Sequence, residues 1–242
     1  ASQVNLVVRQ TLHLANEAIK AIQLEDKSTA GRMIGHLQQY GNLELGTAAK
    51  ANVAILFVDV RGSTSRAKSL GPIKTYLTMH AFLSAMTYLV ERHDGYIVGF
   101  RGDGLFAAFG LVRDGSEDTE TDAGRNVQVA GLCGRTMIDA VEYVVNPALE
   151  TYNVQGELAI GVGIDHGEVV ITRIGLGNTY EITAYGDAVN EASKLSGSAG
   201  LIVLSPGADD LFPSSEGGAL KTEDVTFNGR SGRSLVFPSR RL

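Results

Sequence analysis

A run of six apolar residues at positions 53–58 is the feature that most constrains the fold of this 242-residue chain. Short runs such as VAILFV, without a polar residue, are typical of strands buried on both faces. The run ends at Asp59, the turn sequence RGST follows at 61–64, and Pro72 is expected to open a helix that reaches about His93. The sequence therefore predicts a buried strand joined by a turn to a helix.

Strand and helix patterns alternate through the rest of the chain. Two apolar-rich runs flank the sequence RGDG at 101–104, which predicts a β-hairpin because Asp-Gly is favoured in tight turns. A second hairpin is expected around the stretch GIDHGEVV, with His166 in its turn. Without an internal repeat, these patterns predict an α/β (α+β) sandwich, with helices at 3–24, 72–93, 125–149 and 186–195 and extended segments at 53–58, 96–100, 105–109, 157–164, 169–174, 181–185, 201–205 and 234–237.

The first 50 residues are expected to form an N-terminal helical arm and linker, and residues 51–242 the principal domain. Apolar residues in 3–24 recur at helical spacing with charged residues between them, which is the pattern of an amphipathic helix. The segment 25–50 is more polar and contains several glycines. Two interpretations of the helix stay open: an arm for dimerisation or regulation, or a strut packed on its own domain.

The composition excludes several classes of protein. Lys and Arg number 21 against 27 Asp and Glu, and the formal net charge of −6 argues against nonspecific nucleic-acid binding. The single cysteine, Cys133, rules out a disulfide framework and is expected to be a small buried side chain. Because the chain has no membrane-spanning apolar stretch and no signal-peptide pattern, we expect a cytoplasmic protein without a membrane partner.

Two aspartates stand at the ends of adjacent predicted strands. Asp59 ends the apolar run, and Asp103 lies in the turn of the first hairpin. Each has a structural alternative, because Asp59 could cap the following turn and Asp-Gly is an ordinary hairpin turn. Taken together, two strand-end carboxylates suit a pair of divalent cations, Mg²⁺ or Mn²⁺, as in phosphoryl-transfer sites.

A turn and a helix face accompany these aspartates. Asn190 and Lys194 stand at i and i+4 of a predicted helix and so share one face. An amide and an ammonium placed in this way can orient an oxyanion and neutralise its charge, although an ordinary exposed helix face is the alternative. Backbone N–H groups of the turn after Asp59 can cradle phosphates, which makes Arg61, Gly62, Ser63 and Thr64 candidate phosphate ligands.

Three sequence blocks in this order resemble the signature blocks of class III nucleotidyl cyclases: FVDVRGST at 57–64, GFRGDGLFAAFG at 99–110 and YGDAVNEASKL at 185–195. The resemblance covers about residues 52–242. It implies a ferredoxin-like βαββαβ palm and a head-to-tail homodimer with active sites at the interface. It also implies that Asp59, Asp103 and the Val60 carbonyl bind two divalent cations, and that Asn190 acts from the opposite protomer.

Three positions depart from the pattern of that family. Lys194 stands where the family normally has arginine, so the charge is kept but the bidentate fork is lost. Adenylate cyclases of the family read the base with a lysine where this chain has Gly99, and guanine readers usually have glutamate there. The partnering base position is Thr183. Of the two residues with which the family usually recognises a purine base, this chain therefore has at most one.

Arg101 offers a substitute for the missing base reader. Side chains alternate along a strand, so Gly99, Arg101 and Asp103 are expected to share one face. A guanidinium can donate to base carbonyls, and a smaller base fits where Gly99 leaves room. Uracil offers two carbonyls, whereas cytosine offers one carbonyl and a ring nitrogen. The alternative is that Arg101 pairs with an acidic neighbour or with a phosphate.

The RGDG-containing block, after an N-terminal helix, is similar to the pyrimidine cyclases of bacterial Pycsar antiphage defence, which are homodimers whose product is read by a separate effector protein. This resemblance implies conversion of UTP to 3′,5′-cyclic UMP and pyrophosphate as an antiviral second messenger. Arg230 or Arg233 is expected to bind the terminal phosphates. A cytidylate cyclase, an adenylate cyclase and a degenerate cyclase-fold dimerisation module remain as alternatives.

Overall fold

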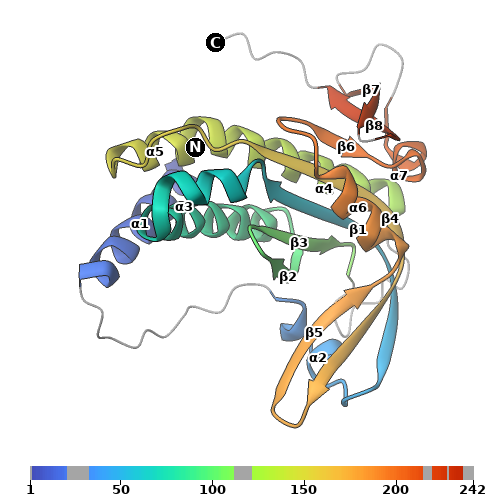
Figure 1. Ribbon diagram of the computed structural model, residues 1–242. Helices are drawn as coiled ribbons and strands as arrows, with labels where there is room; N and C mark the ends of the chain where they lie inside the picture. The colour runs from blue at the N-terminus through green and yellow to red at the C-terminus, as the bar shows by residue number, and fades with distance from the viewer. Residues whose placement is uncertain (1, 21–32, 112–121, 215–219, 228, 237–242) are drawn as a thin grey trace.

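The computed structural model describes residues 2–20, 33–111, 122–214, 220–227 and 229–236 (Figure 1). An eight-stranded sheet has the order β2-β3-β1-β4-β6-β8-β7, and β5 pairs with β4 beside this path. The strands are β1 Ala48–Val60, β2 Tyr96–Arg101, β3 Gly104–Phe109, β4 Ile160–Leu176, β5 Thr179–Tyr185, β6 Ile202–Leu204, β7 Lys221–Phe227 and β8 Arg230–Val236.

The first four strands and two long helices have the βαββαβ order that the sequence predicts. Strand β1 lies between β3 and β4 and is antiparallel to both, while β2 pairs with β3. Helix α3 (Ser63–Arg92) connects β1 to β2, and α4 (Ala123–Ala140) follows β3 and precedes β4. The predicted α/β class, the palm and the first hairpin are therefore confirmed.

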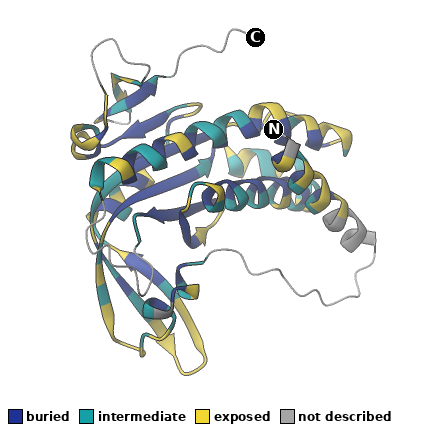
Figure 2. Ribbon diagram, turned by 180° about the vertical axis from the view of Figure 1, so that it is seen from behind, coloured by how far each residue is buried: buried dark blue, intermediate teal, exposed yellow. Residues whose placement is uncertain are grey.

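Helices α3 and α4 cover one face of the sheet, and helix α1 (Ser2–Lys20) packs on α3 (Figures 1 and 2). Three apolar side chains of α1, Val4, Val8 and Leu12, are buried in the large core of this face. Cys133 of α4 is also buried there, as the sequence predicts. Among the residues whose side chains are described, the apolar face of this amphipathic helix therefore packs against the helix's own domain.

The opposite face of the sheet carries a smaller apolar cluster. It is covered by the short 3₁₀ helix Ile34–His36, by α2 (Gln38–Gly41) and by α6 (Asp187–Leu195). Within it, the rings of Phe57 and Phe106 stack with centroids 5.2 Å apart. Arg101 and Asn190 line a cavity on this second face, whereas Ser63, Thr64 and Asp103 line a cavity beside α3.

Strand β4 corrects the expected second hairpin. The segments 157–164 and 169–174 are not two strands around a turn, because β4 runs unbroken for 17 residues and contains His166. Pairing with β1 extends along most of its length, from Ile160 opposite Val60 to Thr172 opposite Ala48. The true hairpin partner of β4 is β5, which pairs with its second half.

Other elements differ from the prediction in extent. Helix α3 begins ahead of Pro72, at Ser63, and is broken at Gly71, which has φ 74°. The expected helix at 125–149 is α4, a π-helical turn at Val141–Val145 and α5 (Asn146–Thr151). Helix α7 (Pro206–Leu211) and strand β7 were not expected. Most of the acidic stretch RDGSEDTETDAG at 113–124 lies outside the described residues.

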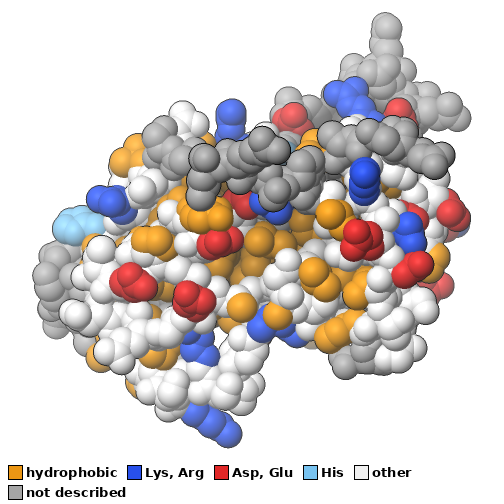
Figure 3. Space-filling view, turned by 90° about the horizontal axis from the view of Figure 1, so that it is seen from above, with side chains coloured by type: hydrophobic (Ala, Val, Ile, Leu, Met, Phe, Trp, Pro, Cys, Tyr) orange, Lys and Arg blue, Asp and Glu red, His pale blue; other side chains and the backbone are white. Residues whose placement is uncertain are grey.

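Charged side chains of both signs are interspersed with apolar ones on the face seen in Figure 3. Within the described parts of the chain, no helix has the length and apolar character needed to cross a bilayer.

Candidate active site

Asp59 and Asp103 lie side by side at one end of the central strands. Asp59 is the penultimate residue of β1 and is paired in register with Gly104, the residue that follows Asp103. Burial and the neighbouring charge of Asp103 raise the pKa of the Asp59 carboxyl above its ordinary value of 3.8, against the opposing effect of Arg61. The structure therefore brings together the two carboxylates that the sequence singles out.

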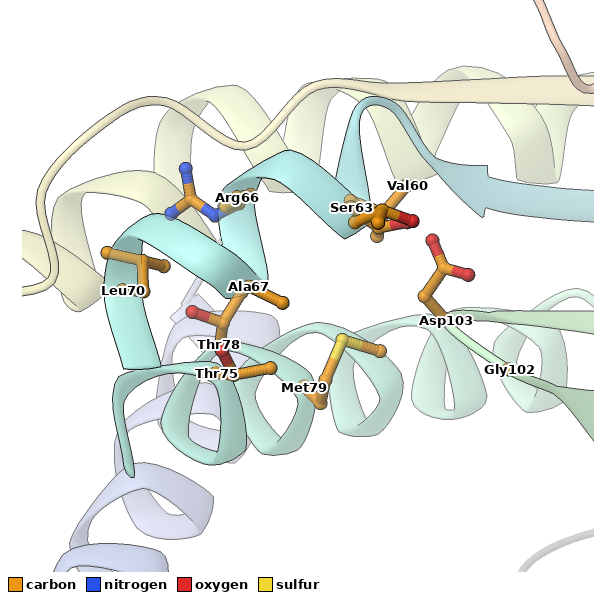
Figure 4. Close-up of a pocket in the computed structure, with 11 residues that line it drawn as sticks. Val60, Ser63, Arg66, Ala67, Leu70, Thr75, Thr78, Met79, Gly102 and Asp103 are labelled. Carbon is orange, nitrogen blue, oxygen red and sulfur yellow. The ribbon is translucent and has the colours of Figure 1, made fainter. Parts of the chain in front are cut away.

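The carboxylate pair fits a divalent cation. Asp103 Oδ2 is buried and has no hydrogen-bond partner among the described residues, and in Figure 4 its carboxylate points toward Val60 and Ser63. A buried carboxylate oxygen without a partner is costly unless a cation or donor meets it. No group of three or more His, Cys, Asp or Glu suited to a metal occurs among these residues. Further ligands would therefore come from the Val60 carbonyl and from the substrate.

The turn after Asp59 begins helix α3. Gly62 is its N-cap with φ 63°, a left-handed conformation that favours glycine, so Asp59 is not the cap of this helix. Ser63 and Thr64 start the helix and line a cavity of about 330 Å³ together with Asp103 (Figure 4). The free N–H groups of a helix N-terminus can donate hydrogen bonds to phosphate oxygens, and two carboxylates beside them could hold a metal that neutralises the phosphate.

The side chain of Arg61 connects two parts of the site. Its Nη2 donates to Asp59 Oδ2, and its Nη1 donates to the carbonyl of Gly197 at 2.9 Å. Gly197 lies just beyond the end of α6, the helix that carries Asn190 and Lys194. The guanidinium thus neutralises Asp59 and holds the turn after α6 at the same time.

A second cavity, of about 450 Å³, lies on the face of the sheet that α6 covers. Its lining includes Asp59, Arg101 and Asn190, with Phe57 and Phe106 as the apolar part. Residues that are far apart in the sequence therefore meet at one cavity that has a carboxylate, a guanidinium and an amide.

The three predicted base-reading positions also come together. Arg101 Nη2 donates to Thr183 Oγ1 at 3.0 Å, and Nη1 donates to Glu181 Oε1 at 2.8 Å. A Cβ atom at Gly99 would lie 3.3 Å from both Arg101 Nη1 and Glu181 Oε1. The room expected beside Gly99 is therefore filled by this ion pair. Sequence reasoning missed Glu181, although it has the same strand parity as Thr183.

The remaining positively charged side chains that the sequence singles out are paired with acidic ones. Lys194 Nζ lies 3.8 Å from Glu191 Oε2, and Arg230 Nη1 lies 2.9 Å from the same oxygen. Glu191 was not predicted, and it joins Arg230 of β8 to the helix of Asn190. Arg233 instead pairs with Asp209 and with Asp224. Phosphate binding by either arginine stays a prediction.

Comparisons with known proteins identify the family of this chain. The model of the adenylate and guanylate cyclase catalytic domain matches residues 46–232. An adenylate cyclase of Anabaena cylindrica is 25% identical over 194 residues, 75% of this chain and 34% of that protein. A cytidylate cyclase of Escherichia coli is 31% identical over 166 residues, 67% of this chain and 35% of that protein. The chain thus spans about a third of the length of these relatives.

Solved structures show the same fold. The adenylyl cyclase CyaB from P. aeruginosa has a TM-score of 0.66 and 22% identity, covering 81% of this chain and 99% of that one. The guanylyl cyclase Cya2 has a TM-score of 0.62 and 21% identity, covering 80% and 96%. With the family model matching well over half of the sequence, the chain belongs to the family of adenylate and guanylate cyclase catalytic domains, the class III nucleotidyl cyclases.

Proposed function

We propose that this chain is a pyrimidine nucleotide cyclase that converts UTP to 3′,5′-cyclic UMP and pyrophosphate. The observation that carries the proposal is the guanidinium of Arg101, which is hydrogen-bonded to Thr183 in the base-reading region and lines the same cavity as Asp59. An arginine head has donors only. It suits the carbonyl oxygens of a pyrimidine and finds no carbonyl on adenine.

The reaction is an intramolecular phosphoryl transfer. The ribose 3′-oxygen forms a bond to the α-phosphorus, the bond to pyrophosphate breaks, and the 3′-hydroxyl proton is released. Two divalent cations, Mg²⁺ or Mn²⁺, would be held by Asp59, Asp103 and the Val60 carbonyl, lowering the pKa of that hydroxyl and neutralising the leaving group. The N–H groups at 62–64 would hold the β- and γ-phosphates, because they lie at the same end of the strands as the aspartates, whereas the N–H of Arg61 donates to the carbonyl of Ala159 at 2.8 Å.

Asn190 and Lys194 would complete the site from a second copy of the chain, arranged head to tail so that two equivalent sites form. Support comes from apolar side chains left uncovered on the β4–β5 hairpin: Leu176 is 86% exposed, and Ile174 and Tyr180 about half exposed. A monomeric domain rarely leaves a cluster of this kind in water. The amide of Asn190 would orient the reacting ribose, and the ammonium of Lys194 would neutralise charge on the transition state.

Cytidine triphosphate is the second candidate substrate, favoured by the similarity to the cytidylate cyclase of Escherichia coli. In either case the cyclic nucleotide would act as a cytoplasmic second messenger in antiphage defence and would be read by a separate effector.

The test is incubation of the protein with Mn²⁺ and each of ATP, GTP, CTP and UTP, followed by mass spectrometry of the products. Cyclic UMP is expected as the principal product. Asp59→Ala and Asp103→Ala should abolish turnover and leave the far-ultraviolet circular dichroism spectrum unchanged, whereas Glu168→Gln, an exposed carboxylate paired with Lys50, serves as the matched control. Cyclic AMP alone would refute the pyrimidine proposal, and no product from any nucleotide would favour a non-catalytic dimerisation module.

A further inference from the structure

Glu181 of β5 is a charged residue of the base-reading region that the proposed function does not use. Its Oε1 accepts a hydrogen bond from Arg101 Nη1 at 2.8 Å across the space above Gly99. About half of each side chain is exposed, so the pair contributes little to folding stability. Folding stability therefore does not explain why Glu181 lies beside Arg101, the candidate base-reading residue.

The hydrogen bonds of Arg101 determine which of its donors remain free. A guanidinium has five N–H groups in one plane. Nη1 uses its two on Glu181 Oε1 and on the carbonyl of Phe100 at 3.1 Å, and Nη2 uses one on Thr183 Oγ1 at 3.0 Å. The N–H of Nε and the second N–H of Nη2 have no acceptor among the described residues. In a guanidinium, the N–H of Nε and one N–H of Nη2 lie on the same edge of the plane and point in parallel, and this edge is free when Thr183 accepts from the other N–H of Nη2.

The surroundings keep this plane in place. The guanidinium carbon lies 5.2 Å from the centroid of the Phe106 ring, which provides an apolar surface beneath it. Phe106 is itself buried and stacked on Phe57. Thr183 is 1% exposed, so its hydroxyl is fixed by the fold. Only Glu181 adds a charge to this set of contacts.

We infer that Glu181 is a positioning residue for base selection: it holds Arg101 so that the free Nε–H and Nη2–H edge faces the base. The inference rests on the proposed function. Two parallel donors can share one carbonyl oxygen, such as O2 or O4 of uracil or O2 of cytosine. Adenine has no carbonyl and presents an amino group that would oppose a donor. Glu181 also cancels the charge of Arg101, so the pair selects by hydrogen bonding rather than by attraction to phosphate.

The test compares Glu181→Ala and Glu181→Gln with the parent, using kcat/KM for UTP, CTP and ATP. Loss of the carboxylate in Glu181→Ala is expected to lower kcat/KM for the pyrimidine substrates about 10- to 100-fold, with little change for ATP. Glutamine keeps an acceptor oxygen in the same place and should restore most of the selectivity. Arg101→Ala should lose at least as much, and Glu168→Ala, which removes a carboxylate also 2.8 Å from its cation, should lose none.

Binding separates this inference from the proposed function. The 3′-deoxy forms of UTP and ATP cannot cyclise, and their affinities are measured by calorimetry with Mn²⁺. If the parent makes no cyclic pyrimidine product, the proposed function fails, yet Glu181→Ala should still reduce the preference for the uridine analogue. If the parent makes cyclic UMP and Glu181→Ala leaves both the product ratio and the binding ratio unchanged, the positioning role is wrong and the proposed function stands.

Discussion

Replacing Gly163 by alanine is expected to disable the site without changing any residue that lines it. Gly163 lies on β4 directly beneath α6, and a Cβ atom there would be 2.0 Å from the carbonyl oxygen of Ala192 and 2.5 Å from the amide nitrogen of Ser196. Contacts below 3.0 Å are essentially never tolerated by a Cβ atom. The backbone of α6 would therefore have to move away from β4 by about 1 Å.

This displacement carries Asn190 and Lys194 with it, because both lie within two residues of Ala192 on the same short helix. A misplacement of about 1 Å in a reacting group costs about 100-fold in rate. Overpacking of this kind also costs about 1–3 kcal/mol of folding free energy. The expected result is a protein that still folds, with kcat/KM for its best nucleotide lowered about 100-fold.

Gly167→Ala is the matched control. It lies on the same strand and faces the same helix, but its Cβ would be 3.5 Å from the Ala188 side chain, an ordinary van der Waals contact. Urea denaturation gives the free energy of unfolding of both variants, and the rate of cyclic nucleotide formation, measured without urea, gives kcat/KM. Equal kcat/KM for Gly163→Ala, Gly167→Ala and the parent would refute the claim that close contact between α6 and β4 sets the position of the catalytic helix.

Three further predictions concern the rest of the fold. Leu12→Ala should lower the free energy of unfolding, measured by urea denaturation, by about 2–5 kcal/mol, because Leu12 is fully buried. If the helical arm were not packed on the domain, the free energy of unfolding would not change. Burial raises the pKa of the Cys133 thiol, so Ellman's reagent should fail to label it in the native protein and label it fully in denaturant. Burial also raises the pKa of Asp165 above 3.8, against the hydrogen bonds that it accepts, so the parent loses stability as the pH rises through that raised pKa. Asp165→Asn should therefore be more stable than the parent at pH 7 and equal to it near pH 3 in urea denaturation, and a parent that is the more stable at pH 7 would contradict this.

Local signals were enough to predict the carboxylate pair. Asp59 ends an apolar run and Asp103 stands in an Asp-Gly turn, and both features depend on residues within a few positions along the chain. Since β1 and β3 are neighbours in the sheet, the two strand ends meet. The alternating apolar patterns predicted the α/β class, whereas the palm was predicted from the resemblance of three sequence blocks to class III nucleotidyl cyclases.

The error at β4 has a physical cause. Glycines in the stretch around His166 suggest a turn, but Gly163 and Gly167 face α6, where the absence of a side chain lets the helix approach. A sequence pattern does not distinguish a glycine that turns the chain from one that admits a neighbouring helix. Strand β7 was missed because its side chains are mostly polar, and it forms by pairing with β8 at the edge of the sheet.

Partners that are distant in the sequence could not be predicted either. Glu181 is a polar residue on a partly exposed strand, and its partner Arg101 is 80 positions away. Arg230 and Glu191 meet only because β8 and α6 approach each other in the folded chain. These contacts depend on tertiary packing, which no local pattern of residue types encodes.

The two bonds made by Arg61 have a thermodynamic consequence. One end of its guanidinium holds a carboxylate suited to a cation, and the other holds the carbonyl of Gly197 at the end of α6. A cation bound by Asp59 would release the arginine and so change the restraint on Gly197. By reciprocity, a motion of that turn would alter the affinity for the cation by the same factor. Ion occupancy and helix position would thereby be linked through a single side chain.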